Sequence, residues 1–141
     1  MAVRESTAHW SGSLKDGNGS MRLGSGAFEG PYSFTSRFEN GAGTNPEELI
    51  AAAHAGCYSM ALAAGLGKAG HQPGSIATTA KVHFGPADGG IAISRIDLET
   101  VASVPGIDAA AFQRIADETK QTCPVSRALS AVEITLNARL E

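Results

Sequence analysis

The stretch Asn45-Pro-Glu-Glu-Leu-Ile-Ala-Ala-Ala-His-Ala-Gly-Cys-Tyr-Ser-Met60 determines how the rest of this sequence is interpreted. Asn45 fits the position that caps a helix, and Pro46 fits the first helical position. Glu48 then occupies the third position, where a glutamate completes a capping box. The alanine-rich residues that follow continue the same pattern to about Lys68. We therefore expect one long helix that begins at this signal.

One face of the expected helix carries mainly small side chains. Leu49, Ala53, Gly56 and Met60 fall on a single stripe at helical spacing. Small side chains let another backbone approach closely, which favours a central and buried helix. Alanine is too weakly hydrophobic, and the polar interruptions are too frequent, for a confident membrane span.

The residues on both sides of this helix are expected to form mainly strands. Turn signals predict a hairpin at residues 15–19 and another at 88–90. Asp108 is expected to cap a second helix. The expected strands cover residues 32–38, 76–84, 90–101 and 132–140. This order predicts a single α+β domain over residues 1–141, with a mostly antiparallel sheet.

Composition narrows the class of protein. The 141 residues are 43% hydrophobic and carry a net charge of −3, which disfavours a nucleic-acid-binding protein because such proteins usually present a basic face. The first residues contain no apolar segment of the kind that opens a signal peptide. We expect a cytoplasmic protein that binds neither nucleic acid nor a membrane.

The sequence contains only two cysteines, Cys57 and Cys123. In a cytoplasmic protein such residues are more often catalytic, redox-active or metal-bound than joined in a structural disulfide. If the fold brings them together, they form a thiol pair that can exchange two electrons. Taken alone, a cysteine among helical alanines is more often a small buried residue, so that interpretation of Cys57 stays open.

A reactive cysteine must be a thiolate at neutral pH. Cys57 lies about three turns inside its helix, where the helix dipole helps little and burial raises the thiol pKa. A cation must therefore face it, and either His54 or Arg37 could supply one. Cys123 precedes Pro124 and could cap a helix, where free N–H groups favour a sulfur anion.

These residues together resemble a known family. Asn45-Pro-Glu-Glu-Leu49, followed by Cys57 and then by Cys123-Pro-Val-Ser126, is similar to the OsmC/Ohr family of thiol-dependent organic hydroperoxide reductases. The segment Ala53–Leu62 is closer to the OsmC branch than to the Ohr branch. The likeness also covers Trp10-Ser-Gly12, Arg37-Phe-Glu39, Val104–Asp108 and Ile134-Thr-Leu136.

The resemblance implies a role for four residues. Cys57 would be the peroxidatic thiolate and Cys123 the resolving thiol. Arg37 would stabilise the thiolate and orient the peroxide, and Glu48 would pair with that arginine. The family fold is an intertwined α+β homodimer with a site at each subunit interface. It uses no bound cofactor, and its reductants are dithiols such as lipoylated proteins.

Helix geometry adds an expectation about the dimer. Glu48 and Cys57 are nine positions apart, so on one straight helix they project to opposite faces and lie roughly 13 Å apart along its axis. We therefore expect Glu48 of one chain to act on the partner's Cys57. Arg37 is a second candidate for acting across the subunit interface in this way.

Other functions are compatible with parts of the pattern. A noncatalytic redox sensor would use the same cysteine pair but would be oxidised once rather than turn over. A relative that kept the fold for small-molecule binding would need no reactive Cys57. A zinc site built on His54 and the cysteines is disfavoured, because structural zinc takes four ligands in closely spaced pairs. No role is expected for His9, His71 or His83.

Overall fold

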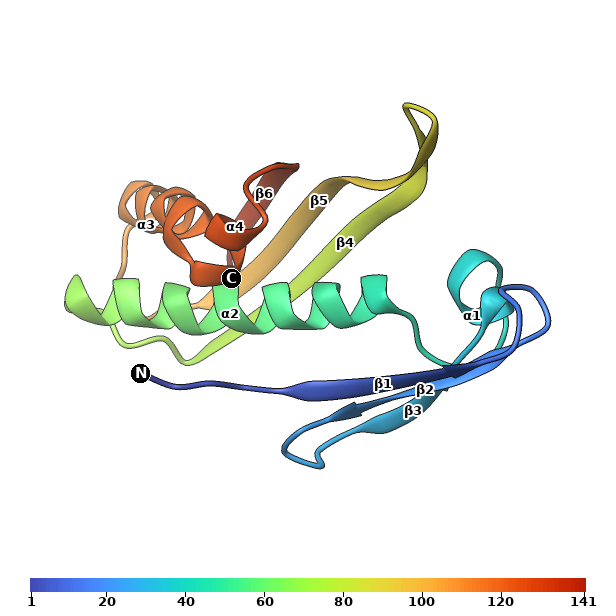
Figure 1. Ribbon diagram of the computed structural model, residues 1–141. Helices are drawn as coiled ribbons and strands as arrows, with labels where there is room; N and C mark the ends of the chain where they lie inside the picture. The colour runs from blue at the N-terminus through green and yellow to red at the C-terminus, as the bar shows by residue number, and fades with distance from the viewer. The chain divides into compact units, whose positions relative to one another are not determined.

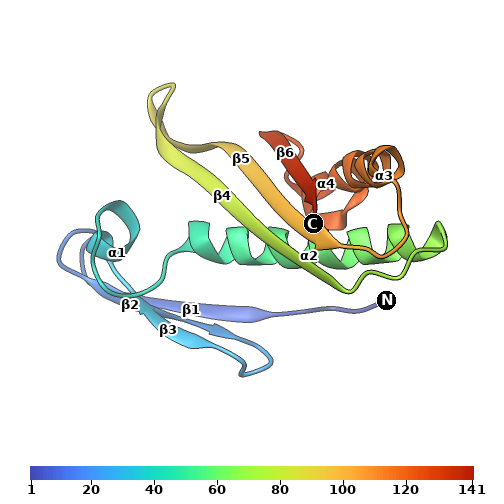
Figure 2. The ribbon, with the colours of Figure 1, turned by 180° about the vertical axis from the view of Figure 1, so that it is seen from behind.

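The computed structural model describes all 141 residues and divides them into two compact units, Met1–Leu49 and Ile50–Glu141 (Figures 1 and 2). The first unit contains a small sheet and a short helix. The second contains a larger sheet, two further helices and most of the long helix. The expectation of a single domain over residues 1–141 stays a prediction.

The first unit is a three-stranded antiparallel sheet of β1 (Ser6–Ser11), β2 (Asn18–Leu23) and β3 (Glu29–Tyr32), in that order. The first two strands pair as the predicted hairpin, with Ser11 opposite Asn18. Gly17 is required in the connection, because a Cβ atom there would collide with the backbone oxygens of Ser11 and Ser13.

The prediction of a strand over residues 32–38 is wrong. The chain leaves β3 at Tyr32 and forms a short helix, α1 (Phe34–Phe38). Ser33 and Ser36 start this helix as a capping box: the Ser36 N–H donates to Ser33 Oγ at 3.2 Å, and the Ser33 N–H donates to Ser36 Oγ at 2.8 Å. Arg37 therefore lies on a helix rather than on a strand.

The long helix α2 (Pro46–Lys68) confirms the predicted start and end. The Glu48 N–H donates to Asn45 Oδ1 at 2.8 Å, so Asn45 is the cap. The Glu48 carboxylate accepts instead from the Thr44 hydroxyl at 2.6 Å, so the second bond of the expected capping box is replaced. Gly70, at φ +87°, supplies the left-handed residue that follows the helix.

Only one face of α2 is buried within this chain. His54, Tyr58, Leu62 and Leu66 are fully buried, whereas the side chain of Met60 is 78% exposed. The expectation that the small-residue stripe would be buried is thus wrong for the single chain. By length and composition α2 could also span a membrane, but this is weak evidence because a core helix of a soluble protein meets the same criteria.

The second unit contains the sheet formed by β4 (Ser75–Ala87), β5 (Gly90–Ser103) and β6 (Glu133–Leu140). β4 and β5 form the predicted hairpin through Asp88 and Gly89, whose φ angles of +37° and +82° suit a two-residue turn. β6 pairs with β5 in parallel, so the mostly antiparallel prediction holds with one parallel pair. Figures 1 and 2 show the hairpin turn at the far end of the sheet from the connecting helices.

Two helices connect β5 to β6: α3 (Ala109–Thr122) and α4 (Pro124–Ala128). The predicted cap of α3 is confirmed, because the Ala111 N–H donates to Asp108 Oδ1 at 2.8 Å. The core lies between the inner face of the sheet, α2 and α3. Its buried members are Tyr58, Leu62, Leu66, Ile96, Leu98, Ala102, Val104, Ile107, Phe112, Ile115, Ala116 and Cys123.

Candidate active site

Cys57 lies on α2 and is half-buried against the core of the second unit. Its side chain reaches toward the junction of α3 and α4, where Cys123 and Val125 lie. There it interacts with the Val125 backbone and with the Cys123 thiol. The fold thus brings together the two thiols, which are distant in the sequence, and both are free.

Cys123 lies where α3 ends and α4 begins, and its side chain is fully buried. Its own N–H donates to the Thr119 carbonyl at 3.0 Å and closes the last turn of α3. Its Sγ accepts from the Ser126 N–H at 3.4 Å, which starts α4. The prediction that Cys123 caps a helix is confirmed.

The surroundings shift the two thiols in opposite directions. Burial raises the pKa of Cys57, the Val125 backbone lowers it in part, and the adjacent Cys123 raises it. Burial also acts to raise the pKa of Cys123, but hydrogen bonds from the side chain and backbone of Ser126, aided by Cys57, hold it below the usual value. Within the second unit, Cys123 is therefore the more acidic thiol.

Arg37 belongs to the first unit, where it pairs with Glu47. Its Nε donates to Glu47 Oε1 at 3.0 Å and its Nη2 donates to Oε2 at 3.1 Å. The prediction that Glu48 is the partner of this arginine is corrected. Successive helical residues point about 100° apart. Glu48 lies near Thr44 and the Asn45 cap, so the preceding Glu47 is the residue that faces α1.

An apolar cavity of about 240 Å³ opens beside Arg37 in the first unit. The guanidinium is the only charged side-chain group in its lining and lies 5.4 Å from the centre of the Phe38 ring. The Trp10 and Tyr32 rings contact each other at a tilt of 55°, with ring centroids 5.3 Å apart. The lining consists of Trp10, Leu14, Tyr32, Ser33, Phe34, Arg37 and Phe38.

His54 and Ser126 extend the contacts of Cys123. His54 Nε2 lies 2.7 Å from Ser126 Oγ, which in turn lies 3.4 Å from Cys123 Sγ. Burial lowers the pKa of His54, so the imidazole is neutral at neutral pH and is not the cation that Cys57 needs. Ser126 belongs to the Cys123-Pro-Val-Ser126 motif, but no local pattern in the sequence predicted its contact with His54, because the two residues are far apart along the chain.

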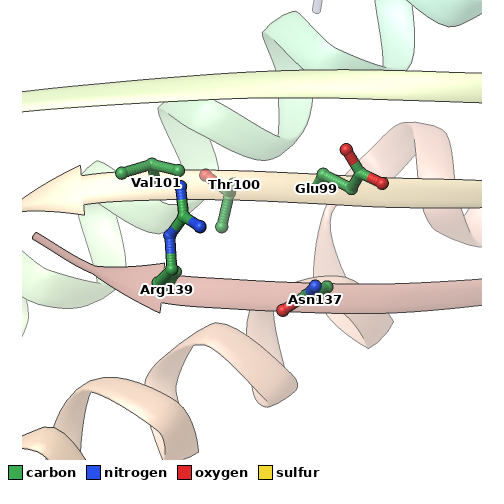
Figure 3. Close-up of a pocket in the computed structure, with 5 residues that line it drawn as sticks. All are labelled: Glu99, Thr100, Val101, Asn137 and Arg139. Atoms are coloured by element: carbon green, nitrogen blue, oxygen red, sulfur yellow. The ribbon is translucent and has the colours of Figure 1, made fainter.

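Another cavity lies away from the thiols. It has a volume of about 180 Å³. Figure 3 shows its lining residues on β5 and β6. Its walls are Glu99, Thr100, Val101, Asn137 and Arg139, none of which is a predicted site residue. No group of three or more histidine, cysteine, aspartate or glutamate side chains is arranged to hold a metal ion.

Comparison with known proteins places this arrangement in a family. The sequence model described as OsmC-like protein matches residues 39–137. The chain is 50% identical over 139 residues to the peroxiredoxin OsmC of Escherichia coli, covering 98% of this chain and 96% of that protein. It is 36% identical over 98 residues to an organic hydroperoxide resistance protein of Xanthomonas axonopodis, covering 68% of this chain and 67% of that protein.

Solved structures agree with the sequence match. An organic hydroperoxide resistance protein from Elizabethkingia anophelis superposes with a TM-score of 0.74 at 25% identity, covering 99% of both chains. Its crystal structure contains a bound thiocyanate derived from the crystallisation medium. The match to the family model spans both cysteines, and the fold agrees over nearly the full length. This chain therefore belongs to the OsmC-like protein family, and its fold is the α+β fold of the OsmC and organic hydroperoxide resistance proteins.

Proposed function

We propose that this protein is a thiol-dependent peroxidase that reduces organic hydroperoxides. The observation that carries the proposal is the direct contact between Cys57 and Cys123 within the second unit. When either cysteine is oxidised, the thiol of the other lies beside it and can react with it. The names of the relatives support the same activity, since one is a peroxiredoxin and another an organic hydroperoxide resistance protein.

The reaction begins with the Cys57 thiolate, which attacks the terminal oxygen of the hydroperoxide. The O–O bond breaks, the alkoxide takes up a proton and leaves as an alcohol, and Cys57 becomes a sulfenic acid. Cys123 then attacks the Cys57 sulfur, the S–O bond breaks, and the hydroxide leaves as water. An external dithiol reopens the resulting disulfide by exchange and is itself oxidised. We assign this reductant to the class of lipoylated or related dithiol proteins, with no cofactor bound to the chain.

Activation of Cys57 is assigned to Arg37. Within the second unit the pKa of Cys57 is raised, so the first step needs a cation to favour the thiolate. A guanidinium can stabilise the thiolate and also donate directed hydrogen bonds to peroxide oxygens. Glu47 holds the plane of the guanidinium through its two hydrogen bonds. Glu48 takes no part in this activation, and its contacts with Thr44 and Asn45 belong to the start of α2.

The apolar cavity beside Arg37 supports a preference for organic substrates. Aromatic rings form most of its wall, and burying an alkyl or aryl group against them is favourable, whereas hydrogen peroxide has no such group to bury. The cavity of about 240 Å³ is large enough for a small alkyl or aryl group. Hydrogen peroxide is therefore the poorer substrate in this proposal.

A homodimer is part of the proposal. The exposed face of α2 carries Ala53, Gly56 and the 78% exposed Met60, a smooth apolar surface that a second copy can cover. Glu47 and Cys57 are ten helical residues apart, a rise of about 15 Å. We therefore assign the Arg37–Glu47 pair of one chain to the partner's Cys57, and we place the dimer in the cytoplasm.

Steady-state peroxide consumption tests the function. With dihydrolipoamide as reductant, we expect repeated turnover of cumene or tert-butyl hydroperoxide, slower turnover of hydrogen peroxide, and loss of turnover in Cys57→Ser. Thioredoxin in place of dihydrolipoamide tests the choice of reductant. A single stoichiometric oxidation with no turnover under any reductant would instead support a redox sensor.

A further inference from the structure

We propose that His54 is a positioning residue for Cys123: through Ser126 it directs a hydroxyl hydrogen bond at the Cys123 sulfur and so accelerates the reaction of Cys123 with an oxidised Cys57. The proposal rests on the roles assigned above to the two cysteines. It adds two polar residues, His54 and Ser126, that those roles do not use.

The geometry joins three elements in one buried line. His54 comes from α2, Ser126 from α4, and Cys123 from the junction before α4. His54 Nε2 and Ser126 Oγ are 2.7 Å apart, and Ser126 Oγ and Cys123 Sγ are 3.4 Å apart. The exposed fractions of the three residues are 0%, 3% and 0%, so water does not compete for these contacts.

The direction of the hydrogen bond between His54 Nε2 and Ser126 Oγ follows from the state of the other imidazole nitrogen, Nδ1. His54 Nδ1 is buried and has no hydrogen-bond partner. A buried N–H without a partner is rarer in proteins than an acceptor with unused capacity, so the proton of neutral His54 belongs on Nε2. Nε2–H then donates to Ser126 Oγ, which leaves the Ser126 hydroxyl hydrogen free to point at Cys123.

In the neutral state the Cys123 thiol donates to Ser126 Oγ, and the Ser126 backbone N–H donates to the sulfur, each at 3.4 Å. A Cys123 thiolate has no proton to donate, so the Ser126 hydroxyl then donates to the sulfur beside the backbone N–H. Without His54, the hydroxyl would have no donor to orient it and could turn its hydrogen elsewhere. His54 therefore acts on Cys123 only through Ser126, which is why it is a positioning residue rather than a catalytic one.

The other ionisable groups that face Cys123 come from α2. Cys57 hydrogen-bonds to it, and Tyr58 lies close enough for the two to interact electrostatically. The Tyr58 hydroxyl donates to the Ala116 carbonyl at 3.1 Å, and burial raises its pKa, so it stays neutral. A substitution of Ser126 on α4 therefore changes the hydrogen bonding of Cys123 without altering Tyr58.

The same donors serve both halves of the thiol chemistry. When Cys123 attacks the Cys57 sulfenic acid, they favour the thiolate, an S–S bond forms, the S–O bond breaks, and hydroxide takes up a proton to leave as water. When a dithiol thiolate later attacks the Cys57 sulfur, the S–S electron pair leaves on Cys123. A leaving thiol with a lower pKa leaves faster.

A single-turnover experiment separates the two steps. The reduced protein receives one equivalent of cumene hydroperoxide, peroxide loss reports the first step, and the decay of a dimedone-trappable sulfenic acid reports the second. We expect Ser126→Ala and His54→Leu to slow the second step about tenfold, the effect of losing one hydrogen bond to a charged group, and to leave the first within about twofold. Ser126→Thr keeps the hydroxyl and should restore the rate.

Ser59→Ala is the matched control, because it also removes a hydroxyl hydrogen bond of α2, the partly buried 2.8 Å bond to Thr78. It should leave the second step unchanged. Equal second-step rates in wild type and His54→Leu would overturn the proposal. So would a slow Ser126→Ala beside a normal His54→Leu, since the histidine would then be irrelevant.

A second measurement does not depend on peroxidase activity. In a Cys57→Ser background, the ultraviolet absorbance of the Cys123 thiolate is followed against pH, with folding verified by circular dichroism. His54→Leu and Ser126→Ala should move the midpoint upward by about one pH unit, equivalent to the same tenfold effect. An unmoved midpoint in folded protein would contradict the proposal. Failure of the assigned function would show differently, as peroxide turnover that survives Cys57→Ser in the otherwise unmodified chain.

Discussion

Arg37 and Glu47 form a bidentate ion pair in which each carboxylate oxygen accepts from a different guanidinium nitrogen, at 3.0 and 3.1 Å. Only 9% of the Glu47 side chain is exposed. Two parallel bonds fix the plane of the guanidinium, and low exposure limits competition from water. This pair therefore presents a rigid cation at the edge of the aromatic cavity formed with Trp10 and Phe34.

The first prediction distinguishes the two adjacent glutamates. We expect Glu47→Ala to lower kcat/KM for cumene hydroperoxide by at least about tenfold, because the guanidinium loses a charge-assisted pair. Glu48→Ala should leave kcat/KM nearly unchanged and lower stability by about 1 kcal/mol, since it loses only the contact with Thr44 at the helix start. Steady-state kinetics and thermal unfolding measure the two effects. The opposite ranking in kcat/KM would restore Glu48 as the arginine's functional partner.

The second prediction concerns the pH dependence of the first step. Burial and Cys123 raise the pKa of Cys57, so without a cation its thiolate fraction at neutral pH is small and grows with pH. Arg37→Met should therefore slow peroxide loss at neutral pH by roughly tenfold or more, and its rate should rise with pH beyond the point where wild type levels off. Single-turnover rates across pH check this. A variant profile that levels off at the same pH as wild type would remove Arg37 from thiol activation.

The third prediction concerns stability at acidic pH. Asp97 accepts hydrogen bonds from Thr135 and His83 and is paired with Arg95, and these contacts lower its pKa from 3.8 to about 2. A lowered carboxyl pKa contributes stability that is complete above the unfolded value and lost as pH falls through the folded one. Asp97→Asn should therefore be less stable than wild type near neutral pH, and the difference should disappear as pH falls from about 4 to about 2. Denaturant unfolding at several pH values measures it, and a constant difference would show that charge is not the cause.

The fourth prediction tests how two chains share a site. Heterodimers are prepared from a Glu47→Ala chain and a Cys57→Ser chain. If the Arg37–Glu47 pair serves the partner's Cys57, one of the two sites in the mixed dimer retains both residues, and about half of the wild-type activity per dimer returns. If the pair serves its own chain, neither site is intact. Mixed dimers no more active than the Glu47→Ala homodimer would therefore require an arrangement within one chain.

Local signals in the sequence predicted the elements that depend on their own residues. Asn45-Pro46, Asp108 and Cys123-Pro124 each start a helix where expected, because a cap is a contact between residues three positions apart. The turn at Asp88-Gly89 likewise needs only its own backbone angles. These signals placed both cysteines on their elements.

The wrong predictions have identifiable physical causes. Aromatic residues at positions 34 and 38 suit an alternating strand and also one helical face, and the Ser33–Ser36 capping box decides in favour of the helix. The choice between Glu47 and Glu48 depends on the direction in which α1 approaches. The parallel pairing of β5 and β6 and the His54–Ser126 contact join segments far apart in the chain, and no local pattern encodes such contacts.

Cys123 caps the end of α3 and the start of α4, and this shared position links the oxidation state of its sulfur to backbone order. Its sulfur accepts the Ser126 N–H that begins α4, and a thiolate accepts more strongly than a disulfide sulfur. We therefore expect oxidation to weaken the start of α4 and reduction to restore it. Amide hydrogen exchange at Ser126 should be faster in the oxidised protein than in the reduced one. Fast exchange at this position would then identify oxidised enzyme that the external dithiol has not yet reduced.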